Sequence, residues 1–460
     1  MTFNSSRVAA AAATFALAGL AWWQTSLVRP DMAFLAGAIV LLVCSWGFRL
    51  LNEGVSALFF FLILALSGSL SPQVVFGGFS SSAFWLIFAG LVIGRAVRES
   101  GLSRRLAHGF RAGKGATYSM ALARVILVSI LFSLFIPSAM GRIVIMLPIL
   151  KGVAEDLGFT LFDSGFSGIM LAGVLGTYLA PFSILPANLP NIVMAGAASS
   201  LYGVNIGYVQ YGLLHFPVMG LGRAVALFFY LRWMFPATIA ERQEAEAATS
   251  WTLREKATAA VICLALVGWM LDSVHGVSPG WVGLGAALLL LLPIKGWYGS
   301  DLLSGIRLDT LLFAACAIGL GGIIRQSGLG NALSSGLLHI LPLEPGHTVK
   351  NVVSILGLYI GTQSITLLPS MPSVQTPLAM EISKLAGMPL LSVIMLQPLA
   401  FGTVLLPYQG PPLVVAMYTG GIPYNHMLRA CLVIGLFALF VLVPLDMLWW
   451  RVMGLPLTLP

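Results

Sequence analysis

The sequence predicts an all-α membrane protein of about 11 transmembrane helices, arranged as two inverted repeats that each contain a re-entrant hairpin and a broken helix. Three observations lead to this prediction. The chain of 460 residues is 58% hydrophobic and only 9% charged, whereas soluble domains have roughly 25% charged residues. A short segment occurs twice, and prolines follow both copies in the same order. These features indicate an internally duplicated protein of the lipid bilayer.

The duplicated segment reads Arg-Glu-Ser-Gly-Leu in its first copy and Arg-Gln-Ser-Gly-Leu in its second, each time at the polar end of an apolar run. A Pro-Ser turn follows each copy, and a proline-rich break follows each turn. One short match can arise by chance, but three landmarks in the same order favour a repeat. The paired landmarks lie at 98–102 and 325–329, at 137–138 and 369–370, and at 183–191 and 408–412.

The apolar runs have the length that a helix needs to cross a bilayer, roughly 20 residues. Two of them are interrupted by proline, and counting each of these as one crossing gives the predicted total. The uninterrupted runs are 7–28, 32–50, 54–71, 82–98, 208–231, 257–275, 278–294, 309–324 and 425–447, and the interrupted ones are 164–201 and 388–420.

The distribution of Lys and Arg predicts the orientation by the positive-inside rule. With the N-terminus in the cytoplasm, most cations fall on the inner side, and this bias accounts for the net charge of +8 without a nucleic-acid partner. The inner side receives Arg49, the group 95–114, Lys151, Arg232, Arg242, Arg254, Lys256, Lys295, Arg307 and Arg429, and the outer side Arg29, Arg325, Lys350, Lys384 and Arg451.

An odd number of crossings separates the two copies of the segment, so the repeat is predicted to be inverted, as alternating access requires. The resulting domain prediction has five parts. They are N-terminal helices on the scaffold side (1–76), repeat 1 (77–235) with an inner hairpin at 117–155, a cytoplasmic linker (236–256), repeat 2 (257–447) with an outer hairpin at 346–385, and a C-terminal tail (448–460).

Each hairpin is predicted to re-enter because its second arm is short. Only a few residues separate Arg142 from Lys151, and at 1.5 Å per residue they cover about 12 Å, less than half of the hydrocarbon thickness. A chain that turns at membrane depth leaves backbone groups unpaired, so such tips tend to bind ions or substrate. The hairpin tips therefore nominate Ser138, Gly141, Ser370 and Ser373 as substrate contacts.

The proline-rich breaks would split their helices and leave half-helix N-termini that favour anions and carbonyl groups that favour cations. The breaks add Asn191, Pro411 and Pro412 to the candidate substrate contacts. Taken singly, each of these positions can be a simple kink. The candidate ion contacts are Ser138, Asn188, Asn191, Ser370 and Gln409.

Arg142 is the leading candidate for direct contact with an anionic substrate. A charge at the bilayer centre costs about 2.5–3.5 kcal/mol and usually faces a cavity or a partner. No acidic residue lies nearby in the sequence. Two alternatives remain open for Arg142, snorkelling to an interface and a structural pair with a distant acid. Arg124 and Arg223 are predicted to extend their charged ends to the membrane interface, and His215 is predicted to be packed inside the protein.

Catalytic and metal motifs are absent from the sequence. It contains no HExxH, no phosphate-binding loop, no CxxC pair and no cluster of carboxylates within a span. The sequence therefore argues against an enzyme and against a zinc site, and the missing intramembrane acids argue against cation transport.

The run 88–106, both hairpins and the Pro190-Asn191 break resemble the divalent anion:sodium symporter family, which carries dicarboxylates, tricarboxylates and sulfate. The resemblance covers roughly residues 30–447 and implies sodium as coupling ion, a homodimer, and an elevator motion of a transport domain against a scaffold. The family's tips read Ser-Asn-Thr, extended to Ser-Asn-Thr-Ala-Arg in its exchanger branch. Here the first tip is Ser-Ala-Met-Gly-Arg and the second Ser-Met-Pro. Sodium coupling therefore stays open, and the matching Arg142 points towards an exchanger.

The leading functional hypothesis is a secondary transporter, a symporter or exchanger of small anions, mainly di- or tricarboxylates, in a bacterial inner membrane. It needs the bilayer, a small anionic substrate and no cofactor beyond the sodium ion that the resemblance implies. Two alternatives remain. One is a cation or metalloid transporter of the same superfamily, and the other is a membrane protein that does not transport, such as a sensor or an intramembrane enzyme.

Overall fold

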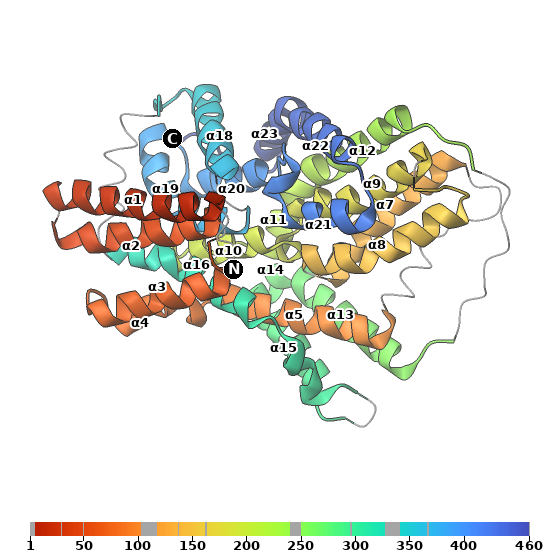
Figure 1. Cartoon of the computed structure of the whole chain (residues 1–460), viewed down its shortest axis with the longest axis horizontal. Helices are drawn as coiled ribbons and strands as arrows, with labels where there is room; N and C mark the ends of the chain where they lie inside the picture. The colour runs from red at the N-terminus through yellow and green to blue at the C-terminus, as the bar shows by residue number, and fades with distance from the viewer. Residues whose placement is uncertain are drawn as a thin grey trace.

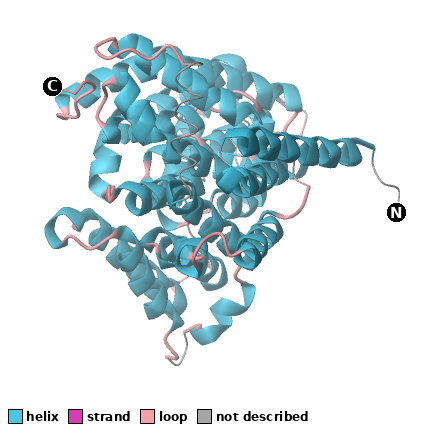
Figure 2. Ribbon diagram, turned by 90° about the vertical axis from the view of Figure 1, so that its left-hand side faces the viewer, coloured by secondary structure: helices cyan, strands magenta, loops and turns pink. Residues whose placement is uncertain are grey.

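The computed structural model describes residues 5–102, 117–239, 250–294, 297–326, 341–365 and 368–459, apart from the single residues 29, 49, 137 and 162. Every regular element that these residues form is a helix (Figure 2). The fold class is therefore all-α, as the composition predicts. Pro137, residues 327–329 of the second repeat segment and much of the predicted linker 236–256 lie outside the described residues.

Each uninterrupted apolar run falls on a helix. Three helical segments are long and apolar enough to cross a membrane, Ser164–Ser183, Tyr208–Met234 and Tyr424–Val452, while six other apolar helices in the described part have 10–17 residues. The exact number of crossings therefore stays a prediction. The helices on the remaining predicted spans are α1 (Ser5–Val28), α2 (Pro30–Gly47), α3 (Glu53–Ser67), α5 (Ser82–Ser100), α13 (Leu253–Met270), α15 (Pro279–Leu291) and α16 (Leu308–Gln326).

The duplicated segment is a helix ending. In the first copy α5 ends at Ser100, and Gly101 adopts a left-handed conformation with φ of 86°. Glycine suits this position because it has no Cβ to clash. Leu102 follows and is buried. In the second copy, α16 is described as far as Gln326, and the Ser-Gly-Leu that follows lies outside the described residues.

The two predicted hairpins consist of α7 (Tyr118–Phe135) with α8 (Ala139–Asp156), and α18 (Thr348–Ile365) with α19 (Met371–Ala386). The short second arm predicted for the first hairpin is wrong. Helix α8 continues past Lys151 and has 18 residues, about 27 Å at 1.5 Å per residue. Lys151 lies inside α8 instead of at its end, and its Nζ donates to the carbonyl of Thr419 at 2.8 Å.

Helix breaks occur at both proline-rich segments. In the first, α9 (Ser164–Tyr178) leads through the turns η2 (Ala180–Ser183) and η3 (Leu185–Ala187) into α10 (Leu189–Tyr202). In the second, α20 (Leu390–Phe401) leads through η7 (Pro407–Gln409) into α21 (Pro411–Gly420). Proline favours such breaks because it lacks the N–H that an internal helical hydrogen bond requires.

A long helix with one π-helical turn follows each broken helix. The first comprises α11 (Tyr208–His215), the π-turn η4 (Phe216–Gly220) and α12 (Leu221–Met234); the second comprises α22 (Tyr424–Phe437), the π-turn η8 (Ala438–Leu442) and α23 (Val443–Val452). The order of paired helices, broken helix and π-containing helix thus occurs twice. Figure 1 shows α7–α9 in the right half of the molecule and α18–α20 in the left half, with α11 between them.

A second group of helices packs against these units. Helix α5 lies along α15, and α16 packs on both α3 and α10. Backbones approach closely at the turn η1 (Gly77–Ser80), where a Cβ on Gly78 would overlap the carbonyl of Ala315 in α16. The remaining short elements are α4 (Pro72–Val75), α14 (Asp272–His275), η5 (Gly299–Gly305) and η6 (Leu368–Ser370).

The close approach at Gly78 predicts a position-specific loss of stability. Gly78→Ala should force η1 away from α16 and lower the free energy of unfolding by about 1–3 kcal/mol, the usual cost of overpacking. Gly77→Ala is the matched control because nothing lies within 4 Å of a Cβ added there. Thermal unfolding of both variants in detergent measures the effect, and equal melting temperatures would contradict the packing described here.

Candidate functional site

A cavity of about 240 Å³ lies between the two groups of helices. One wall comes from α2, α3, α5 and α16. The other comes from the points where four helical segments begin, at Ser138 before α8, Asn188 before α10, Ser370 before α19 and Pro411 in α21. The first four N–H groups of a helix have no partner within it, and the helix dipole is positive at this end. Proline at the first or second position of α10, α19 and α21 removes some of these N–H groups, but the remaining N–H groups and the helix dipoles still favour an anion at this cavity.

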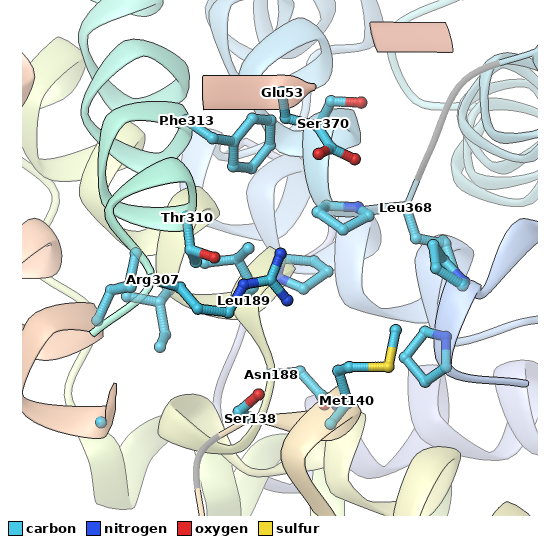
Figure 3. Close-up of a pocket in the computed structure, with 18 of the residues that line it drawn as sticks. Glu53, Ser138, Met140, Asn188, Leu189, Arg307, Thr310, Phe313, Leu368 and Ser370 are labelled. Atoms are coloured by element: carbon cyan, nitrogen blue, oxygen red, sulfur yellow. The ribbon is translucent and has the colours of Figure 1, made fainter. Parts of the chain in front are cut away.

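Side-chain donors supplement these backbone groups. Ser138 accepts a hydrogen bond from the backbone N–H of Gly141 at 3.2 Å, which leaves its own O–H available to the cavity. Figure 3 shows Ser138, Asn188 and Met140 on one side of the cavity and Ser370 on the opposite side. Two sets of donors can therefore approach an anion from opposite directions.

The predicted site residues separate into two groups. Ser138, Asn188, Ser370, Pro411 and Pro412 line the cavity, so their predicted contacts with substrate or ion stay predictions that this location permits. The others do not line the cavity and form hydrogen bonds in the turns behind it. Asn191 donates to the carbonyls of Phe182 and Ile184, and Ser373 donates to the carbonyl of Ser370. Gln409 accepts from the backbone N–H groups of Leu405 and Leu406, and Gly141 and Arg142 lie in the first turn of α8.

Arg142 is completely buried and does not line the cavity. Its Nε donates to Thr177 Oγ1 at 3.0 Å, and its Nη1 donates to the carbonyls of Ile136 and Ala187, both at 2.7 Å. Its Nη2 donates to the Thr177 carbonyl at 3.0 Å and to Asn188 Oδ1 at 3.1 Å. A guanidinium has five N–H donors, and protein oxygens accept all of them. The predicted direct contact with the anion is therefore wrong for this conformation, because the partners are carbonyls that the sequence does not reveal.

The contact between Arg142 and Asn188 determines how the amide of Asn188 points. Because Oδ1 accepts from the guanidinium, Nδ2 must face the other way. Asn188 Nδ2 is buried and has no hydrogen-bond partner in the described part of the chain. A buried donor without a partner is costly, so this N–H₂ group is suited to an anion in the adjoining cavity. Arg142 thus positions a donor without touching the cavity.

The opposite wall carries charged residues that are not among the predicted site residues. Arg307 lines the cavity, and its Nη2 donates to Asp309 Oδ2 at 2.7 Å and its Nε to Asp309 Oδ1 at 3.3 Å. The Arg307 side chain is 60% exposed, and Figure 3 shows its guanidinium reaching into the cavity. The sequence signal for Arg307 is the Arg-x-Asp spacing at the start of an apolar run, but Arg307 enters the sequence-based prediction only through the positive-inside rule.

Apolar side chains cover the space around these donors. Trp46 and Phe313 meet edge to face with ring centroids 4.8 Å apart, and both line the cavity together with Met140 and Phe182. An apolar lining excludes water and strengthens the hydrogen bonds that an anion accepts there.

The prediction that the spans contain no acidic residue is also wrong. Asp446 falls within the predicted span 425–447 and is completely buried in α23. Its Oδ2 lies 3.5 Å from Nδ1 of His215, which is buried as well. His215 is packed as expected, but it faces an ionisable partner. Neither residue lines the anion cavity.

Known proteins resemble the chain over most of its length. A citrate/succinate antiporter from Escherichia coli is 24% identical over 405 residues, which cover 81% of this chain and 80% of that protein. A putative malate transporter from Bacillus subtilis is 24% identical over 353 residues, 70% of this chain and 71% of that protein. A protein from Cupriavidus necator described as a membrane protein is 24% identical over 399 residues, 82% of this chain and 76% of that protein.

A solved structure supports the fold. The crystal structure of the YdaH transporter from Alcanivorax borkumensis matches with a TM-score of 0.56 and 15% identity, covering 89% of this chain and 100% of that chain. The family model described as the sodium:sulfate symporter transmembrane region matches residues 6–456. A multi-pass membrane fold, a cavity formed by helix N-termini and this match lead to one conclusion: the chain belongs to the divalent anion:sodium symporter family.

Proposed function

We propose that this protein is a secondary transporter that carries small di- or tricarboxylates across a bacterial inner membrane by alternating access. The convergence of four helix N-termini on one cavity is the observation that carries the proposal. The names of three relatives agree with this proposal. They are a citrate/succinate antiporter, an L-tartrate/succinate antiporter and a putative malate transporter.

The arrangement of donors suits an anion with more than one carboxylate. Ser138 and Asn188 lie on one side and Ser370 on the other (Figure 3), so separate carboxylates of one molecule can each accept hydrogen bonds. Arg307 adds a guanidinium, which binds carboxylates in a planar, bidentate manner. An anion entering the cavity competes with Asp309 for this guanidinium, and exchange of one carboxylate for another keeps the charge of Arg307 compensated.

Arg142 favours exchange over sodium symport. The carbonyls of Ile136, Thr177 and Ala187 come from a hairpin tip and a helix break, and loosened carbonyls of this kind can hold a cation. Here the guanidinium of Arg142 takes these acceptors and supplies the positive charge. We therefore infer that this half of the protein needs no sodium ion, and that a counter-anion drives substrate movement.

The transport geometry belongs to the same proposal. The element order that occurs twice, and the location of its copies in opposite halves of the molecule in Figure 1, support two inverted repeats with re-entrant hairpins. The positive-inside distribution supports a cytoplasmic N-terminus, which places Glu53 and Arg307 at the inner side and makes the cavity inward-facing. The proposal also includes three features that the family resemblance implies: a homodimer, a division into scaffold and transport domain, and an elevator motion of the transport domain.

Counterflow in proteoliposomes tests the function. Vesicles preloaded with succinate should take up labelled succinate, malate or citrate, and a sodium gradient should change the rate little. Empty vesicles and protein-free vesicles are the controls. Uptake that requires sodium and proceeds without internal anion would refute the exchange mechanism, and absence of transport for all these anions and sulfate would refute the function.

Replacing Arg142 tests its positioning role. Lysine carries a point charge with three donors, so Arg142→Lys should leave some break carbonyls and Asn188 unpaired. Loss of buried hydrogen bonds to a charged group costs roughly 1.5–3 kcal/mol, so succinate affinity should fall about 10-fold or more. Titration calorimetry of detergent-purified protein measures the affinity. Arg124→Lys on the exposed face of α7 is the matched control, and unchanged affinity in Arg142→Lys would contradict the role.

Replacing Arg307 tests direct contact with the anion. Arg307→Gln should weaken binding of succinate by roughly 10-fold or more, since a charged hydrogen bond is worth about 1.5–3 kcal/mol. The melting temperature without ligand should change little because the Arg307–Asp309 pair is partly exposed. Arg451→Gln, an exposed residue at the end of α23, serves as control. Equal succinate affinity in the Arg307 and Arg451 variants would exclude the contact.

A further inference from the structure

Three ionisable side chains are buried together away from the anion cavity. His215 ends α11, Arg223 lies in α12 and Asp446 lies in α23, and their exposed fractions are 1%, 2% and 0%. All three lie within a few residues of the π-turns η4 and η8. π-Turns often mark functional sites, and ionisable groups inside a membrane protein are usually functional because burying them is costly.

The geometry of this cluster leaves it incompletely paired. The Asp446 carboxylate faces the imidazole of His215, the indole of Trp450 and the guanidinium of Arg223. Among the described residues, neither carboxylate oxygen and neither imidazole nitrogen forms a hydrogen bond. The ring of Tyr211 packs on His215 with centroids 4.7 Å apart. An acid and an imidazole that face each other at 3.5 Å can share one additional proton.

The charge of the cluster depends on that proton. With Asp446 ionised, Arg223 protonated and His215 neutral, the cluster has no net charge. Binding one proton to the His215–Asp446 pair makes it positive.

The cluster contacts both helix breaks directly. Nη1 of Arg223 lies 3.5 Å from the carbonyl of Leu179, where α9 ends. A Cβ on Gly402, where α20 ends, would lie 2.8 Å from the same nitrogen. The O–H of Tyr211 donates to the carbonyl of Phe182 at 2.7 Å, and Phe182 lines the anion cavity. A change of charge here therefore acts on the segments that hold the N-termini of α10 and α21.

A second cavity reaches the helix turns beside the cluster. It has a volume of about 600 Å³ and is lined by Gln210 and Leu213 of α11 and by Met453, which follows α23. His215 and Trp450 lie on the same two helical segments, two residues from Leu213 and three from Met453, but none of the three cluster residues lines this cavity.

We propose that His215 and Asp446 form a proton-binding site, and that a proton bound there raises the affinity of the anion cavity through Arg223 and Tyr211. The inference rests on the proposed function, because it couples proton binding to carboxylate binding. The coupling is reciprocal. Protons strengthen anion binding, and anion binding takes up protons.

Two measurements on the full-length protein in detergent test this site. Succinate affinity is measured by calorimetry from about pH 8 to about pH 6. Proton uptake on adding succinate is measured with a pH dye in weakly buffered solution. The wild type should bind about 5-fold or more tightly at the lower pH and should take up protons, as typical coupling between sites predicts.

The variants Asp446→Asn and His215→Gln should each abolish proton uptake and flatten the pH dependence. Because succinate is the same in all samples, its own titration cannot produce a difference between variants. Asp301→Asn and His347→Gln, both exposed, are matched controls and should behave like the wild type.

Two results would overturn the inference while leaving the proposed function intact. One is wild-type counterflow with succinate affinity that does not depend on pH. The other is full proton uptake in folded His215→Gln or Asp446→Asn, with folding checked by gel filtration. If the wild type neither binds nor exchanges succinate, malate or citrate at any pH, the proposed function fails and this inference fails with it.

Discussion

The five hydrogen bonds of Arg142 are the interaction on which the rest of the site depends. A chain that leaves helical geometry inside an apolar protein must find partners for its carbonyls, since no solvent replaces the lost bonds. One guanidinium meets that requirement for the hairpin tip at Ile136 and for the break between Thr177 and Asn188. It thereby fixes the starts of α8 and α10 relative to each other, and both starts face the cavity.

The same constraint explains why the cavity suits anions. Breaking two helices exposes N-termini on the cavity side and carbonyls on the far side. Arg142 satisfies the carbonyls of the first break, so the N–H groups remain for a ligand. Asn188 links the two tasks because its Oδ1 accepts from Arg142 while its Nδ2 has no partner among the described residues. Substrate binding and backbone satisfaction are therefore parts of one network.

Much of the fold was predictable because it follows from local rules. Hydrophobic length located the helices, and prolines at 183–191 and 408–412 located the breaks. The site was only partly predictable. Ser138 and Ser370 followed from the hairpin tips and Pro411 from the breaks, but three of the five hydrogen bonds of Arg142 go to backbone carbonyls, which look alike in every sequence. Arg307 and Asp446 were overlooked because their roles depend on tertiary neighbours, and α8 was drawn too short because Lys151 pairs with a carbonyl instead of ending the helix.

The two halves of the protein satisfy their breaks with different chemistry. In the first half a charged guanidinium does so, whereas in the second half neutral amides do: Gln409 accepts from the backbone at 405 and 406, and Gln363 donates to the carbonyl of Thr403. In the first half, the fixed positive charge of Arg142 therefore lies behind the helix starts. A fixed charge cannot dissociate as sodium does, so it cannot deliver energy from an ion gradient. Any coupling ion must act elsewhere, and the described cluster at His215 and Asp446 lies against both breaks through Arg223.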